Sequence, residues 1–420
     1  MRIALVCDSM SAFGGAERVI EQILRIYPTA DLFTVLDVVP ENQRAFLRGR
    51  RIQTSFLQKL PKVSRYYRKL LHYWPLAVEQ LDVTNYDLVI SSHHSVAYGV
   101  LTRPGQVHVS YVHTPMRYAW DLQHEYLRNA RLDRGPVGML ARRTLHKVRI
   151  WDYAAAQRPD AMAANSGFVA ERLLKTHRRY ATVIHPPVAV EERPRPAPAI
   201  PPREGAGYYL SLGRLVPYKR VDLLARAFAR APHRRLKIAG DGPDMAKVAA
   251  LRAPNVEVLG FQPHDRVQEL MTGAEAYIFA GIEDFGIAAV EAQAAGTPVI
   301  AYRAGGLTET VVGPHRPDPT GLFFAEQSEE SILDAVEAFE RNRPLFTRGA
   351  CLANAARFSE RRFRDAFSAF VEQTQINSAN AHDAQFDPAW SWESFRERHL
   401  DGRAATSAAQ GSAPIAHRLV

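Results

Sequence analysis

Short apolar runs alternate with amphipathic segments along most of the chain. In the first half, such runs predict strands at 3–7, 32–36, 88–91, 107–112 and 161–165. Between the first two strands, residues 16–26 carry apolar side chains at helical spacing. Strands that alternate with helices predict a parallel, doubly wound sheet.

Residues 188–206 interrupt this pattern with a stretch rich in proline and in charged side chains. Proline cannot donate to a strand ladder and restricts its neighbour, so this stretch predicts an extended linker. The alternation then restarts, with a helix expected at 221–231 and strands expected at 208–212, 236–239, 256–259, 276–280 and 298–301. The sequence therefore predicts an α/β protein with one domain at 1–187 and another at 207–358, as expected for 420 residues.

The last part of the chain changes in composition. Ser359 can cap a helix, which we expect over 359–375 and which would cross back to the first domain. Residues 376–420 are rich in Ala, Ser, Asn and Asp and show little periodicity, which predicts a disordered tail with a short helix near 390–399.

Cellular location is predicted from absent signals. No apolar run reaches about 18 residues, so no spanning helix is expected. The first run, Ile3 to Cys7, is too short for a signal-peptide core, because Asp8 follows at once. Cys7 and Cys351 lie far apart in sequence, and reduced thiols in a cytoplasm are the simpler interpretation.

The formal net charge of +9 favours acidic partners, which are nucleotides, phospholipids or nucleic acid. Residues 42–78, which contain no Asp or Glu, carry nine Lys or Arg side chains and six aromatic ones. We expect a pair of helices here. It is either a solvated face with a few core aromatics or a patch that binds anionic lipid, where each cation contributes about 1 kcal/mol. The membrane-surface candidates are Arg50, Arg51, Arg68 and Lys69.

The most specific motif is the phrase at 283–299, which follows a predicted strand. Gly286 and Ile287 are expected to open a helix, with Glu283 in the preceding loop and Glu291 inside the helix. A helix N-terminus offers free N–H groups and a positive dipole end to an anionic leaving group. A carboxylate in the first turns of such a helix can accept hydrogen bonds from a vicinal diol such as ribose.

A second motif, Gly213 to Arg220, directly follows the first strand of the second half. Its Arg214 and Lys219 are placed to clamp a pyrophosphate, since doubly wound folds bind ligands at the carboxyl ends of their strands. The same phrase taken alone is also compatible with a solvated basic turn.

Two weaker signals lie in the first half. Gly14 and Gly15 stand at a predicted helix start, where glycine allows close approach of a phosphate or sugar, although the phrase differs from the dinucleotide fingerprint. His113 ends a predicted strand at a sheet edge, and histidine is the side chain most often used for acid–base work near neutral pH.

Together these motifs resemble those of the retaining glycosyltransferases of family 4, and the resemblance covers roughly residues 1–375. The resemblance implies the GT-B fold, in which two Rossmann-like domains face each other across a cleft. It assigns the donor diphosphate to Arg214 and Lys219, the ribose to Glu291, and the donor sugar to Glu283 with the backbone at Phe285, Gly286 and Ile287. It further places His113 near the reacting carbon and places the turns that contain Gly240 and Phe261 beside the nucleotide. The family usually needs no metal and no cofactor beyond the nucleotide sugar.

The stretch from His113 to Asp121 looks like that of bacterial mannosyltransferases that build O-antigen and exopolysaccharide. This resemblance implies transfer of mannose from GDP-mannose to a growing glycan, which we expect to be lipid-linked, by a protein at the inner face of the cell membrane. A UDP-sugar donor, a sugar-nucleotide 2-epimerase of the same fold and an inert scaffold remain alternatives. A nucleic-acid-binding protein is a distant one, because the basic residues match no zinc spacing or nucleic-acid module.

Overall fold

The computed structural model describes residues 1–190 and 207–385. Most of the predicted linker, and residues 386–420 of the predicted tail with its short helix at 390–399, lie outside the described residues. Met1–Phe370 form one compact unit, and a second unit begins at Val371.

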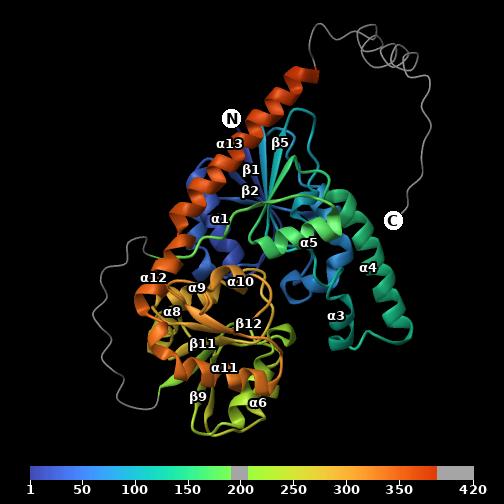
Figure 1. The fold of residues 1–420 in the computed structure, drawn as a ribbon. Coiled ribbons are helices and arrows are strands. Elements are labelled where there is room, and N and C mark those ends of the chain that lie inside the picture. Colours follow the sequence, from blue (N-terminus) through green and yellow to red (C-terminus); the bar gives the residue numbers. More distant parts are fainter. Residues whose placement is uncertain (191–206, 386–420) are drawn as a thin grey trace, which may run out of the picture. The chain divides into compact units, whose positions relative to one another are not determined.

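Among the described residues, the first half forms a sheet of seven parallel strands in the order β3-β2-β1-β4-β5-β6-β7 (Figure 1). The central β1 pairs with β2 on one side and with β4 on the other, so that Val6 faces Phe33 and Ser91 in register. The central strands β1 and β4 are almost wholly buried, which explains their continuous apolar runs. Their bounds are β1 Ile3–Met10, β2 Asp31–Asp37, β3 Ile52–Thr54, β4 Leu88–His93, β5 Val107–Val112, β6 Ala161–Ala164 and β7 Thr182–Val183.

Helices connect these strands, as a parallel sheet requires. The helix after β1 begins at Gly15, and the helix after β6 is capped by Ser166, whose hydroxyl accepts from the Val169 N–H. The α-helices described in this half are α1 Gly15–Ile26, α2 Trp74–Glu79, α3 Gln123–Asn129, α4 Gly135–Ala155 and α5 Gly167–His177.

The second half forms a sheet of six described strands, all parallel, in the order β10-β9-β8-β11-β12-β13. The strands are β8 Tyr208–Leu212, β9 Arg235–Ala239, β10 Val256–Gly260, β11 Ala276–Phe279, β12 Val299–Tyr302 and β13 Gly321–Phe324. The helices are α6 Val221–Ala229, α7 Met245–Ala249, α8 His264–Gly273, α9 Ile287–Ala294, α10 Leu307–Thr310, α11 Glu329–Arg341 and α12 Arg348–Ala355.

Every predicted strand overlaps an observed one, and the two doubly wound parallel sheets are confirmed. The strands β3, β7 and β13 were not predicted. The first two contain only three and two residues, which is too short for a periodic signal.

Two expectations about helices are wrong. Residues 42–78 do not form a pair of helices, because Glu41–Glu79 contains short 3-10 turns, the strand β3 and only the six-residue α2. The C-terminal helix, α13 Glu360–Gln385, continues ten residues past its predicted end at 375, so 376–385 are helical rather than disordered. The predicted cap is present, since the Ser359 hydroxyl accepts from the Arg362 N–H at 3.3 Å.

Candidate functional site

A cavity of about 480 Å³ lies where strand ends of both sheets meet. The turn after β1 contributes Gly14 and Gly15, and the end of β5 contributes His113. From the second sheet come Lys219, at the end of the turn Pro217–Lys219, and Glu283 from the loop before α9. This volume is typical of small-molecule sites, and strand carboxyl ends are where doubly wound sheets bind ligands.

The two glycines bring helix α1 close to helix α9. A Cβ atom on Gly15 would lie 2.7 Å from Cδ1 of Ile287, so no side chain fits there without a shift. The Gly14 N–H donates to the carboxylate of Glu17 at 3.1 Å, which fixes the start of α1. Gly15 therefore allows two walls of the cavity to approach each other, and Gly14 helps to fix the start of α1.

Helix α9 presents its N-terminus and one carboxylate to the cavity. Gly286 precedes the helix with φ of 92°, a left-handed conformation that favours glycine. Glu291, one turn into the helix, lines the cavity and accepts from Arg18 of α1 at 2.6 Å. The predicted placement of Glu283 in the loop and of Glu291 in the helix is confirmed.

Lys219 and Glu283 form an ion pair, with 2.8 Å between Nζ and Oε1. Burial lowers the pKa of Lys219, but the Glu283 carboxylate and Tyr218 together raise it by more, so the pKa lies above its ordinary value. Lys219 is therefore a fixed positive charge at the cavity wall, and its partner is a carboxylate that an anionic ligand would have to displace or share.

His113 is held as a neutral imidazole. Its Nε2 lies 2.9 Å from the Ser92 hydroxyl, and the Asn165 amide donates to its backbone carbonyl at 2.8 Å. Burial lowers the pKa of His113 to about 3. Near neutral pH the ring is therefore suited to hydrogen bonding and not to carrying a positive charge.

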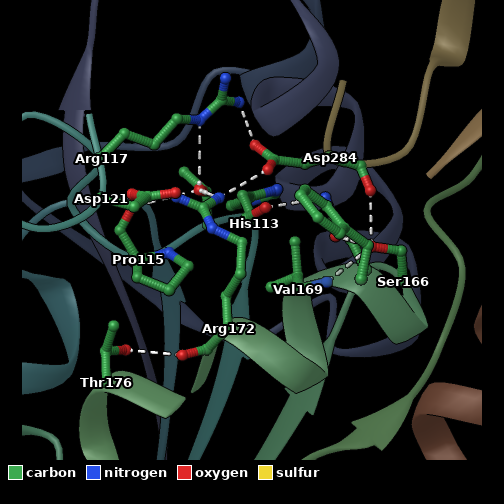
Figure 2. A network of polar contacts seen from close by, with 12 residues as sticks. His113, Pro115, Arg117, Asp121, Ser166, Val169, Arg172, Thr176 and Asp284 are labelled. Carbon is green, nitrogen blue, oxygen red and sulfur yellow. Dashed lines mark hydrogen bonds and ion pairs between the residues drawn. The ribbon is translucent and has the colours of Figure 1, made fainter. Parts of the chain in front are cut away.

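Asp284 anchors a polar network beside the cavity (Figure 2). Its carboxylate is paired with the guanidinium of Arg117 and with that of Arg172, the latter at 2.7 Å. Arg172 also binds Asp121 at 2.7 Å, and the Ser166 hydroxyl donates to the Asp284 backbone carbonyl. Asp284 thereby ties the loop before α9 to the segment after β5 and to helix α5.

The cavity gathers most of the predicted site residues. The predicted residues that line it are Gly14, Gly15, His113, Lys219, Glu283, Phe285, Gly286, Ile287 and Glu291. Three others do not line it. Arg214 is exposed and lines a second cavity. Phe261 is 78% exposed. Gly240 packs so closely against the backbone that a Cβ atom on it would lie 1.8 Å from the Gly213 carbonyl oxygen.

Several lining residues were not predicted. Arg18, Arg117 and Asp284 stand inside or next to quoted phrases, but their ion pairs join segments far apart in sequence. His94 also lines the cavity, whereas the neighbouring His93 is buried and stacks on Tyr98. Nothing in the described ranges forms a group of three or more His, Cys, Asp or Glu side chains that could hold a metal ion.

The membrane-surface candidates differ in their surroundings. Arg50 donates to the backbone carbonyls of Leu47 and Pro28, so it has a structural partner in the fold. Arg51 and Lys69 are exposed, and the side chain of Arg68 lies outside the described residues. Within residues 1–190 and 207–385, no helix has the length and apolar character that a membrane span requires.

Both halves of the chain match known families. Residues 13–192 match the family described as Glycosyltransferase Family 4, and residues 194–357 match the one described as Glycosyl transferases group 1. A D-inositol 3-phosphate glycosyltransferase of Mycobacterium sp. is 28% identical over 254 residues, which are 56% of this chain and 55% of the relative. One of Nocardia farcinica is 31% identical over 302 residues, 65% of this chain and 63% of the relative. The chain thus spans a little more than half the length of these curated relatives.

Solved structures agree in fold. The lipopolysaccharide outer core galactosyltransferase WaaB superposes with a TM-score of 0.58 at 19% identity, covering 89% of this chain and 99% of that one. HepE of Anabaena in complex with UDP superposes with a TM-score of 0.63 at 17% identity, covering 89% of this chain and all of that one. Because the sequence identities are this low, the similarity of these structures to the present chain establishes the GT-B fold alone.

Proposed function

Because the chain belongs to the family 4 glycosyltransferases, we propose that it transfers a hexose from a nucleotide sugar to a glycan acceptor with retention at the anomeric carbon. The observation that carries this proposal is the cavity in which Lys219, the N-terminus of α9, Glu291 and His113 converge. In this cavity, a cation and free N–H groups can bind a diphosphate, and a carboxylate can bind ribose. A neutral imidazole lies in the same cavity.

The reaction follows from these groups. The bond between the anomeric carbon and the diphosphate oxygen breaks, and the acceptor hydroxyl oxygen bonds to the same face of that carbon. The hydroxyl proton passes to the departing diphosphate oxygen. Lys219 and the N–H groups at the start of α9 stabilise the charge that develops on the diphosphate, which is electrostatic preorganisation without a metal or cofactor.

The remaining groups position the donor. Glu291 accepts hydrogen bonds from the ribose hydroxyls, and Glu283 with the backbone at Gly286 holds the hexose. The neutral ring of His113 hydrogen-bonds the hexose near the reacting carbon. Arg214 lies outside the cavity in this structure, so its proposed role at the diphosphate requires its side chain to turn toward Lys219.

We propose GDP-mannose as donor, on the resemblance carried by residues 113–121. A UDP-sugar is the second candidate, since the HepE structure of the same fold contains UDP. A thermal-shift panel of GDP-mannose, UDP-glucose, UDP-galactose and ADP-glucose tests both, because a ligand at 100 times its Kd stabilises a protein by about 2.7 kcal/mol. No shift with any of the four would contradict the proposal.

The acceptor is proposed to be a growing, lipid-linked bacterial polysaccharide. The curated relatives are named for D-inositol 3-phosphate, which makes that compound the soluble acceptor to test beside it. Product that forms only when an acceptor is added supports transfer. Epimerised sugar nucleotide formed without an acceptor would favour the 2-epimerase instead.

We propose that the protein is cytoplasmic and binds the inner face of the cell membrane through residues 42–78. The exposed Arg51 and Lys69 are the cations of this segment to change, since Arg50 has backbone partners. Binding to anionic vesicles should be lost at high salt and in an Arg51→Glu/Lys69→Glu variant. Binding that is equal for both proteins at low salt would refute this role.

A further inference from the structure

A second, larger cavity lies beside the donor site and is not used by the proposed reaction. Its volume is about 820 Å³, and its walls come from helix α4 and from the segment Tyr67–Trp74. Most of its lining is apolar, including Leu71, Val137 and Leu140. A cavity of this size and character suits a hydrocarbon chain better than a sugar.

The cavity is contiguous with the donor site. Ala16 and His94 line both cavities, so a molecule in the larger one reaches the donor site past these two residues. Arg214, which does not line the donor cavity, lines the larger one. The larger cavity therefore adjoins the donor site at Ala16 and His94.

The charges of the lining favour an anionic head group. Lys69 and Arg214 supply cations, and both are exposed. Glu17 is the one acid among the lining residues, and its carboxylate is already bound by the Gly14 N–H. An anionic group in this cavity thus meets net positive charge.

Helix α4 also exposes apolar side chains to the surroundings. Met139, Ile150 and Tyr153 are 72%, 59% and 45% exposed, and with Arg143 and His146 they repeat at a spacing of four and three residues. That spacing places them on one helix face. The helix carries no acid from residue 134 to 151, so this face combines apolar groups with cations, as surfaces that lie on anionic lipid do.

We propose that the cavity between α4 and Tyr67–Trp74 seats the hydrocarbon chain of an anionic lipid whose head group carries the acceptor sugar to the donor site past His94. This inference rests on the proposed function and adds where the acceptor binds. The exposed face of α4 then meets the membrane from which the lipid comes, while residues 67–74 of the basic segment form the inner wall of the site.

The test uses octyl, decyl and dodecyl phosphate as probes, with isothermal titration of the full-length protein. Burial of one methylene contributes about 0.8 kcal/mol, so affinity should rise up to fourfold per added methylene. Leu140→Gln should weaken decyl phosphate binding about tenfold, because the substitution makes part of the cavity wall polar, while the exposed position of Leu140 spares the fold. Leu345→Gln, at an exposed leucine that does not line the cavity, is the matched control.

Affinity that does not depend on chain length, or an equal loss in both variants, overturns the proposal. Titration of the same samples with GDP and UDP keeps the two hypotheses apart. If a nucleotide binds but the alkyl phosphates show no chain-length dependence, the lipid cavity is wrong and the proposed function stands. If the alkyl phosphates bind as expected and neither nucleotide does, the proposed donor site is wrong and the lipid cavity stands.

Discussion

Nη1 of Arg18 in helix α1 lies 2.6 Å from Oε1 of Glu291 in helix α9, and the two residues are 273 positions apart in the sequence. Both side chains are largely shielded from solvent and line the donor cavity. The ion pair fixes the direction of the carboxylate that we assign to the ribose. A residue of the first half thereby positions a residue of the second half that we assign to donor binding.

Arg18→Ala should weaken nucleotide binding about fivefold, which corresponds to about 1 kcal/mol, because Glu291 loses the partner that orients it. Titration with the nucleoside diphosphate that proves to bind measures this. Arg25→Ala is the control on the same helix, since Arg25 pairs with Glu21 and Glu360 and does not line the cavity. Tighter binding by Arg18→Ala would mean that Arg18 competes with the ribose for Glu291.

Lys219→Ala should weaken nucleoside diphosphate binding by at least tenfold. A hydrogen bond to a charged group contributes about 1.5–3 kcal/mol, and the variant also leaves Glu283 facing the diphosphate without its counter-ion. Lys247→Ala removes a lysine of the same half whose partner is Asp222, so it should bind normally. Equal affinity of the Lys219 variant and the wild type would remove Lys219 from the diphosphate site.

The local part of the site could be predicted from the sequence. The position of Glu283 in a loop, the helix start at Gly286 and the strand end at His113 each depend on a few neighbouring residues, whose turn and helix signals are strong. Parallel strands then bring their carboxyl ends to one edge, which explains why nine predicted residues line one cavity.

The contacts across the cavity could not be predicted in this way. Arg117 and Asp284 belong to two separate motifs and are 167 residues apart, and the sequence of neither motif indicates that the two make contact. The orientation of the Arg214 side chain also cannot be predicted from a motif, because a long side chain at a strand end can turn to either of two cavities. The helices predicted in 42–78 failed for another reason, since composition reports charge and aromatic content but not backbone geometry.

His113→Ala should reduce turnover by more than tenfold, about 1.4 kcal/mol of barrier, and leave nucleotide affinity nearly unchanged. The reason is that we assign His113, at the end of a strand of the first sheet, to the hexose, whereas most of the residues that we assign to the nucleotide belong to the second half. His113→Gln, which retains a hydrogen-bonding side chain toward Ser92, should recover part of the rate. Turnover of His113→Ala within tenfold of wild type would make His113 a structural residue.

The stability of the protein should fall as the pH is lowered from 6.5 toward 3. Burial lowers the pKa of both His108 and His113 to about 3, whereas in the unfolded chain both titrate near 6.5. Between these values the unfolded state binds more protons, so the free energy of unfolding decreases by about 1.4 kcal/mol per pH unit for each imidazole. Urea denaturation at pH 7, 6 and 5 measures the slope.

His108→Gln isolates one of these two contributions, because His108 does not line the donor cavity and its Nε2 lies 3.0 Å from the Ser91 hydroxyl. The variant should be less stable at every pH, but below pH 6.5 its free energy of unfolding should fall less steeply as the pH is lowered. The difference in bound protons between the unfolded and folded states should be smaller by about one. His264→Gln, at an exposed histidine of α8, should leave the slope as in the wild type. Parallel pH curves for His108→Gln and wild type would show that His108 accepts a proton in the folded state, and burial would then not be expected to keep His113 neutral either.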